Sequence, residues 1–100
     1  MTSKTKREPD FIAMACTSAS VPYREVLTPD ELVRALASGQ VPRNRFAHFC
    51  MLFEEAPEVL LHGLVEQVSE TSDRSIVMEN IFRIAREMEV TDRVRKIFGG

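Results

Sequence analysis

The side chains best suited to chemistry in this sequence are its two histidines. His62 has Glu58 four residues before it and Glu66 four residues after it. Because residues four apart share one face of a helix, this spacing could form half of a zinc site or hold a general base between carboxylates. The same pattern is more typical of ordinary pairs on a solvated helix face. A small enzyme or metal site around His62 and Glu66 is therefore the least favoured of three functional hypotheses.

His48 and the two cysteines offer weaker chemistry. His48 and Cys50 are two residues apart, a spacing that points their side chains in different directions on a helix. Cys50 also lies among phenylalanines, which disfavours the thiolate that a nucleophile or metal ligand needs. Cys16 and Cys50 belong to no Cys-x-x-Cys motif, so we expect free thiols in a reducing, cytoplasmic setting. The sequence also has no glycine-rich phosphate loop, and we expect no cofactor, no metal and no catalytic residue.

A short basic segment supports the second hypothesis, a DNA-binding transcriptional regulator. Arg43, Asn44 and Arg45 begin the second of two predicted helices, so that residues 29–56 have the layout of a helix-turn-helix unit. These three side chains would then face the bases. However, the second helix is too apolar to lie in a groove, and the net charge of the chain is −2. Nucleic acid is therefore not the favoured partner.

The elements that would position these residues are all predicted to be helical. With 100 residues, 44% of them hydrophobic and 28% charged, the chain has the size and composition of one globular domain. It has no stretch of about 18 apolar residues, so we expect no membrane span. We predict an all-α fold, a compact four- to five-helix domain with a flexible N-terminal tail. Residues 1–10 would be a disordered tail, 11–27 a poorly defined segment and 28–100 the helical domain.

The clearest local signal is the start of the first helix, predicted over 29–38. Thr28 can cap this helix, Glu31 completes a capping box, and Gly39 can end it in a left-handed conformation. Apolar spacing predicts the remaining helices at 43–56, 57–69 and 75–89, followed by a last turn that carries Val94, Ile97 and Phe98.

Two of these helices carry wider apolar stripes than one small core needs, which supports the first hypothesis. We expect Phe46, Phe49 and Phe53 to lie in the core. Other residues lie at or beyond the edges of the stripes, and they predict a partner-binding face made of Met51, Met78, Phe82, Arg83 and Arg86. The favoured function is a small non-enzymatic regulatory or adaptor protein, similar in mode to an anti-activator, that masks a protein partner. A homodimer would use the same kind of face.

Overall fold

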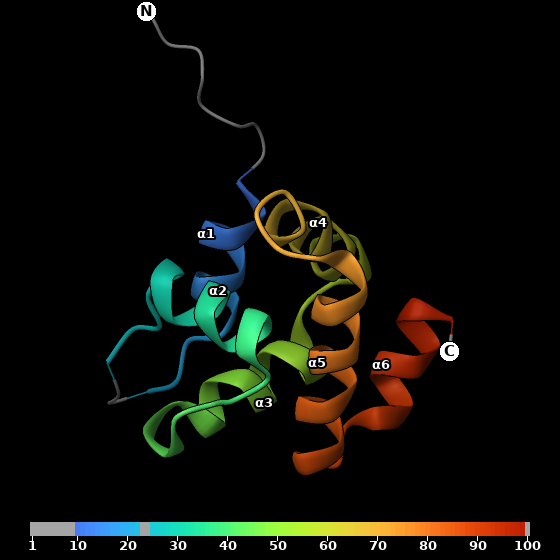
Figure 1. Cartoon of the computed structure of the whole chain (residues 1–100). Helices are drawn as coiled ribbons and strands as arrows, with labels where there is room; N and C mark the ends of the chain where they lie inside the picture. Colours follow the sequence, from blue (N-terminus) through green and yellow to red (C-terminus); the bar gives the residue numbers. More distant parts are fainter. Residues whose placement is uncertain (1–9, 23–24, 100) are drawn as a thin grey trace, which may run out of the picture.

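The fold is all-α, as the apolar spacing predicts. The computed structural model describes residues 10–22 and 25–99, and within them the chain forms six α-helices, one short 3₁₀ helix and no strand (Figure 1). The predicted disordered tail lies outside the described residues, except for Asp10. The helices are α1 (Phe11–Ser18), α2 (Pro29–Ser38), η2 (Arg43–Arg45), α3 (Phe46–Glu55), α4 (Glu58–Val68), α5 (Arg74–Glu87) and α6 (Thr91–Phe98).

The additional helix, α1, lies in the segment that the sequence leaves poorly defined. The Asp10 side chain caps it by accepting a hydrogen bond from the backbone N–H of Ala13 at 3.2 Å. At the end of the same segment, Leu27 is buried with 1% of its surface exposed. Residues 11–27 therefore contribute to the folded domain at both ends.

The start and end of α2 are confirmed in detail. The Thr28 hydroxyl accepts from the Glu31 N–H at 3.2 Å, and a Glu31 carboxylate oxygen accepts from the Thr28 N–H at 3.0 Å. Gly39 ends the helix with φ of +81°, a left-handed conformation that glycine adopts without steric cost. Local sequence signals alone define this helix.

The predicted helix 43–56 differs at its beginning. Arg43–Arg45 form the 3₁₀ turn η2, and α3 starts only at Phe46. The prediction that Phe46 is a core residue is wrong, because the first residue of α3 lies at the margin of the core and keeps 40% of its surface exposed. His48 is fully buried, and its ring lies within hydrogen-bonding distance of the backbone carbonyl of Glu25.

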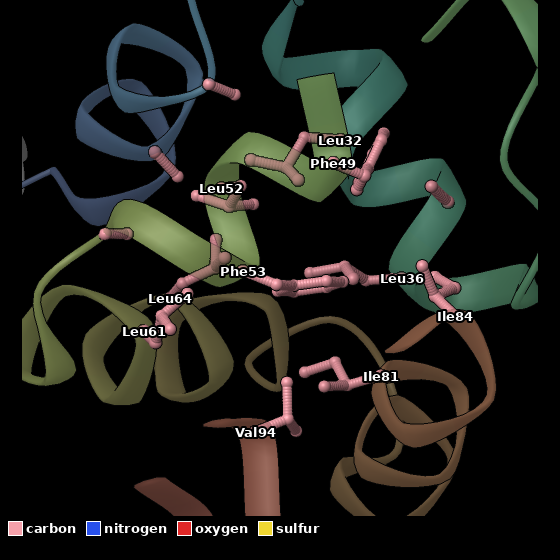
Figure 2. Packing of buried hydrophobic residues seen from close by; sticks show 14 of the residues in the cluster. Leu32, Leu36, Phe49, Leu52, Phe53, Leu61, Leu64, Ile81, Ile84 and Val94 are labelled. Carbon is pink, nitrogen blue, oxygen red and sulfur yellow. The ribbon is translucent and has the colours of Figure 1, made fainter. Parts of the chain in front are cut away.

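The core surrounds α3 and is mainly aliphatic. Phe49 and Phe53 are buried as predicted, with ring centroids 6.4 Å apart. Figure 2 shows these rings among leucines from α2 and α4 and isoleucines from α5. The apolar face of each helix therefore meets several neighbours.

A separate helix, α6, covers part of the wide apolar stripe on α5. Glu89 turns the chain with φ of +60°, and α6 then packs beside α5 with Val94 and Ile97 buried (Figure 1). Because α5 also packs on α2 and α4, much of its stripe is covered within the chain. None of the helices in the described residues is long and apolar enough to cross a bilayer.

Side chains from distant helices bind the backbone at buried helix ends. Arg93 on α6 donates to the carbonyl oxygens of Phe53 and Ala56 at 2.6 and 2.7 Å, at the end of α3. Asn80 on α5 donates to the carbonyl of Leu36, near the end of α2, at 2.8 Å. These carbonyls have no partner within their own helices, so the distant side chains satisfy them.

We predict that Arg93→Met lowers the free energy of unfolding by about 2 kcal/mol, because it removes two charge-assisted hydrogen bonds and leaves two carbonyls without them. Arg93→Lys keeps the charge but lacks the planar fork, so it should recover only part of the loss. Urea denaturation followed by circular dichroism measures the effect. Arg95→Met, at an exposed position of the same helix, is the control. Equal stability of the Arg93→Met variant and the wild type would contradict this role.

Candidate partner-binding face

Four of the five predicted partner-binding residues lie on α5. Met78 and Phe82 are half-buried and pack against the core with part of their surface. Arg83 and Arg86 are exposed on the solvent side of the same helix. The arrangement is an apolar edge beside two guanidinium groups, on a helix fixed by α2, α4 and α6.

Met51, the fifth predicted residue, is separated from these four. It is half-buried on α3, and α3 packs mainly on α1, α6 and η2. The helices that carry the two parts of the predicted face therefore do not pack extensively on each other. The candidate face is best defined by α5.

Ile76 is a residue of this helix that the sequence reasoning missed. It keeps 48% of its surface exposed in the first turn of α5. Its neighbour Val77 is fully buried, so the two adjacent apolar residues point to different sides of the helix. On a helical wheel, Ile76 lies outside the row of Val77, Ile81 and Ile84. This position is the signal that could have identified Ile76 as an exposed apolar residue.

The structure places His62 in a helix contact rather than beside its predicted carboxylate partner. Its Nε2 lies 3.0 Å from the carbonyl oxygen of Ile97. Its ring makes an edge contact with the ring of Phe98, and the two ring centroids are 4.9 Å apart. Glu66 instead forms an ion pair with Arg74 at 3.2 Å. In the part of the chain that the structure describes, no three His, Cys, Asp or Glu side chains gather as a metal site would require. The geometry at His62 joins α4 to the end of α6.

Of the three predicted nucleic-acid contacts, Arg45 is engaged elsewhere. Its side chain is buried and bonds to the carboxylates of Glu31 at 3.0 Å and Glu25 at 3.2 Å. Arg43 and Asn44 remain exposed in η2. Since Arg45 already has two carboxylate partners, it is not available to a phosphate or a base edge in this conformation.

The two cysteines are free and are not activated. Burial is the main cause that raises the pKa of the Cys16 thiol to about 11. Burial also raises the pKa of Cys50, which lies half-buried on α3. Both thiols are therefore kept protonated near neutral pH, the opposite of what a nucleophile needs.

Comparison of the chain with protein-family models, with characterised proteins and with solved structures finds no match. The candidate face therefore rests on the geometry described above.

The capping box should make the stability of the fold depend on pH in the acidic range. The hydrogen bond from the Thr28 N–H, with a further contribution from Arg45, lowers the pKa of Glu31 below its usual value. A carboxylate with a lowered folded-state pKa stabilises the fold above its unfolded-state pKa, near 4.3, and this contribution is lost as the pH falls through the folded-state pKa. Glu31→Gln should therefore be less stable than the wild type at pH 7, and the difference should shrink toward pH 3.

Urea titrations of both proteins at a series of pH values measure this difference. Glu87→Gln, at an exposed position of α5, is the control and should leave the acid dependence unchanged. A Glu31→Gln difference that stays constant from pH 7 to pH 3 would contradict the role of the ionised carboxylate.

Proposed function

We propose that this protein is a small non-enzymatic regulatory or adaptor protein that binds another protein and masks a surface which that partner needs. One observation on α5 carries the proposal. Met78 and Phe82 are partly exposed on this helix, which also carries the exposed Arg83 and Arg86.

In the proposed binding mode, Met78 and Phe82 form an apolar centre, and Arg83 and Arg86 form a charged rim. Methionine adapts to uneven partner surfaces, and an aromatic side chain is a frequent energetic centre of an interface. Arg83 and Arg86 can form charge-assisted hydrogen bonds at the rim, where they set orientation and association rate. The core contacts of Met78 and Phe82 hold these two side chains in place before a partner arrives.

A second copy of the chain is part of the same proposal. Homodimers are the commonest assembly, and a self-interface needs the same residue types as an interface with another protein. We place the dimer contact on the α5 face too. The free Cys16 and Cys50 fit a reducing compartment, so we propose a cytoplasmic location.

The two other hypotheses have less support from the geometry. A DNA-binding unit over residues 29–56 would have to act through Arg43 and Asn44, because Arg45 is held by carboxylates. An enzyme at His62 would have to act without Glu66, which pairs with Arg74. Neither site brings together the groups that its chemistry needs.

Charge reversal on the exposed side of α5 tests the proposal. Met78 and Phe82 also pack on the core, so substituting them would mix binding with stability. We predict that Arg83→Glu combined with Arg86→Glu keeps the circular dichroism spectrum and the urea midpoint of the wild type but loses a protein captured stoichiometrically from nuclease-treated lysate. Mass spectrometry of the captured material gives the readout.

The control is Arg43→Glu, which makes one such arginine-to-glutamate change on η2, half of the charge change in the double variant. It should retain the captured protein. Capture that survives the α5 double variant, or that is lost equally in Arg43→Glu, would contradict binding through this face. Salt-sensitive binding to duplex DNA that Arg43→Glu weakens would favour the DNA-binding hypothesis instead.

Self-association gives a separate prediction. The wild type should sediment as a dimer in analytical ultracentrifugation at micromolar concentration. The Arg83→Glu and Arg86→Glu double variant should sediment as a monomer, because four acidic groups would replace four basic groups across a two-fold contact. A monomeric wild type, or a dimer that the double variant leaves intact, would contradict a dimer contact on α5.

A further inference from the structure

The first helix and α4 form one continuous surface, because Phe11 is seated on a glycine. The ring of Phe11 lies directly over Gly63, in the middle of α4, so that a Cβ atom built at Gly63 would be 2.5 Å from three ring carbons. The Gln67 side-chain oxygen, one turn further along α4, accepts hydrogen bonds from the backbone N–H groups of Phe11 at 2.8 Å and Ile12 at 3.3 Å. Helix α1 also packs more extensively on α4 than on α2 or α3 (Figure 1). The side chains along this junction are therefore fixed relative to one another.

Two apolar side chains beside the Phe11 ring are open to solvent. Met14, three residues after Phe11, lies on the same side of α1 and keeps 43% of its surface exposed. Val59, four residues before Gly63, lies on the same side of α4 and keeps 70% exposed. Phe11 itself is half-buried. Because the Phe11 ring bridges the two helices, Phe11, Met14 and Val59 form one apolar surface, the α1–α4 patch.

Carboxylates border this patch, and no lysine or arginine lies on either helix. Glu58 precedes Val59, and Glu66 follows Val59 by two turns on the same side of α4; both glutamates are exposed. The wider segment 46–73 contains six carboxylates and no lysine or arginine. Glu66 pairs with Arg74 at 3.2 Å, but these two side chains are 67% and 56% exposed. Exposed pairs of this kind contribute little to stability, so another guanidinium can replace Arg74 at small cost.

The α5 face carries the complementary groups. Met78 and Phe82 supply partly exposed apolar surface, and Arg83 and Arg86 supply positive charge. Residues 74–99 together contain six basic and four acidic groups, so this part of the chain is basic where 46–73 is acidic. Two α5 faces in direct contact would bring four arginines together, and like charges across an interface oppose binding. A contact between an α5 face and an α1–α4 patch instead places guanidinium groups beside carboxylates.

From this complementarity, we propose that the α5 face of one copy binds the α1–α4 patch of a second copy. The inference rests on the self-association proposed above, and it names the surface that α5 contacts. The apolar side chains of the two surfaces cover each other, while Arg83 and Arg86 pair with Glu58 and Glu66. A two-fold dimer contains this contact twice, once in each direction.

Val59→Arg tests the patch with little effect on the fold, because the Val59 side chain is mostly exposed. The variant removes apolar surface and places a positive charge against Arg83 and Arg86. We expect the dissociation constant of self-association, measured on the full chain by analytical ultracentrifugation, to rise at least tenfold. Val26→Arg is the matched control, since Val26 is 66% exposed and lies outside α1 and α4. No weakening by Val59→Arg, or equal weakening by both variants, would overturn the proposal.

A charge exchange tests the pairing directly. The Glu58→Arg and Glu66→Arg double variant should sediment as a monomer, like the Arg83→Glu and Arg86→Glu double variant. An equimolar mixture of the two should associate with a dissociation constant within tenfold of the wild-type value, because every α5 face then meets a patch of opposite charge. Circular dichroism and urea midpoints check that both variants are folded. A mixture of folded variants that stays monomeric would overturn the proposal.

The outcomes separate this inference from the proposed function. A dimer that the α5 double variant loses but the α4 double variant keeps would overturn the α1–α4 patch as the contact and leave self-association on α5. A dimer that both variants keep would overturn both. A monomeric wild type, together with a basic protein captured from lysate and lost in Val59→Arg, would assign the patch to that protein and overturn the second copy as its occupant.

Discussion

The structure depends on how the ends of its short helices are satisfied. Helices of 8 to 14 residues have many backbone N–H and C=O groups at their ends that lack partners within the helix. Packing such helices into one domain brings several of these ends out of solvent. Side chains from distant helices then bind them: Arg93 at the end of α3, Asn80 at the end of α2 and Gln67 at the start of α1. These bonds fix how the helices are placed relative to one another.

This constraint also explains where the chemically capable side chains are used. His48 and His62 both lie within hydrogen-bonding distance of backbone carbonyls, and Arg45 is held between two carboxylates. These chemically capable groups are therefore engaged in contacts within the fold. Arg83 and Arg86 are exposed on α5, and our proposal assigns them to the contact with a partner.

The sequence predicts the helices well where the signals are local. Thr28, Glu31 and Gly39 define α2 from neighbouring residues alone, and apolar spacing places α5 within one or two residues. Prediction from the sequence fails where a side chain contacts a residue that is distant in the chain. The burial of His48 depends on a carbonyl 23 residues away, and no local pattern carries that information. The sequence shows a wide apolar stripe on α5, but only the three-dimensional structure shows that α6 covers part of this stripe.

The most direct test of this account is the tautomeric state of the two histidine rings, measured from their ring nitrogen shifts by NMR. A carbonyl oxygen can only accept, so we assign the proton to Nε2 in both His48 and His62. The account predicts one fixed tautomer for each ring, with the Nε2 proton bonded to Glu25 or Ile97. A proton on Nδ1 of His48, or rapid exchange between tautomers at His62, would contradict the claim that these side chains hold the fold together.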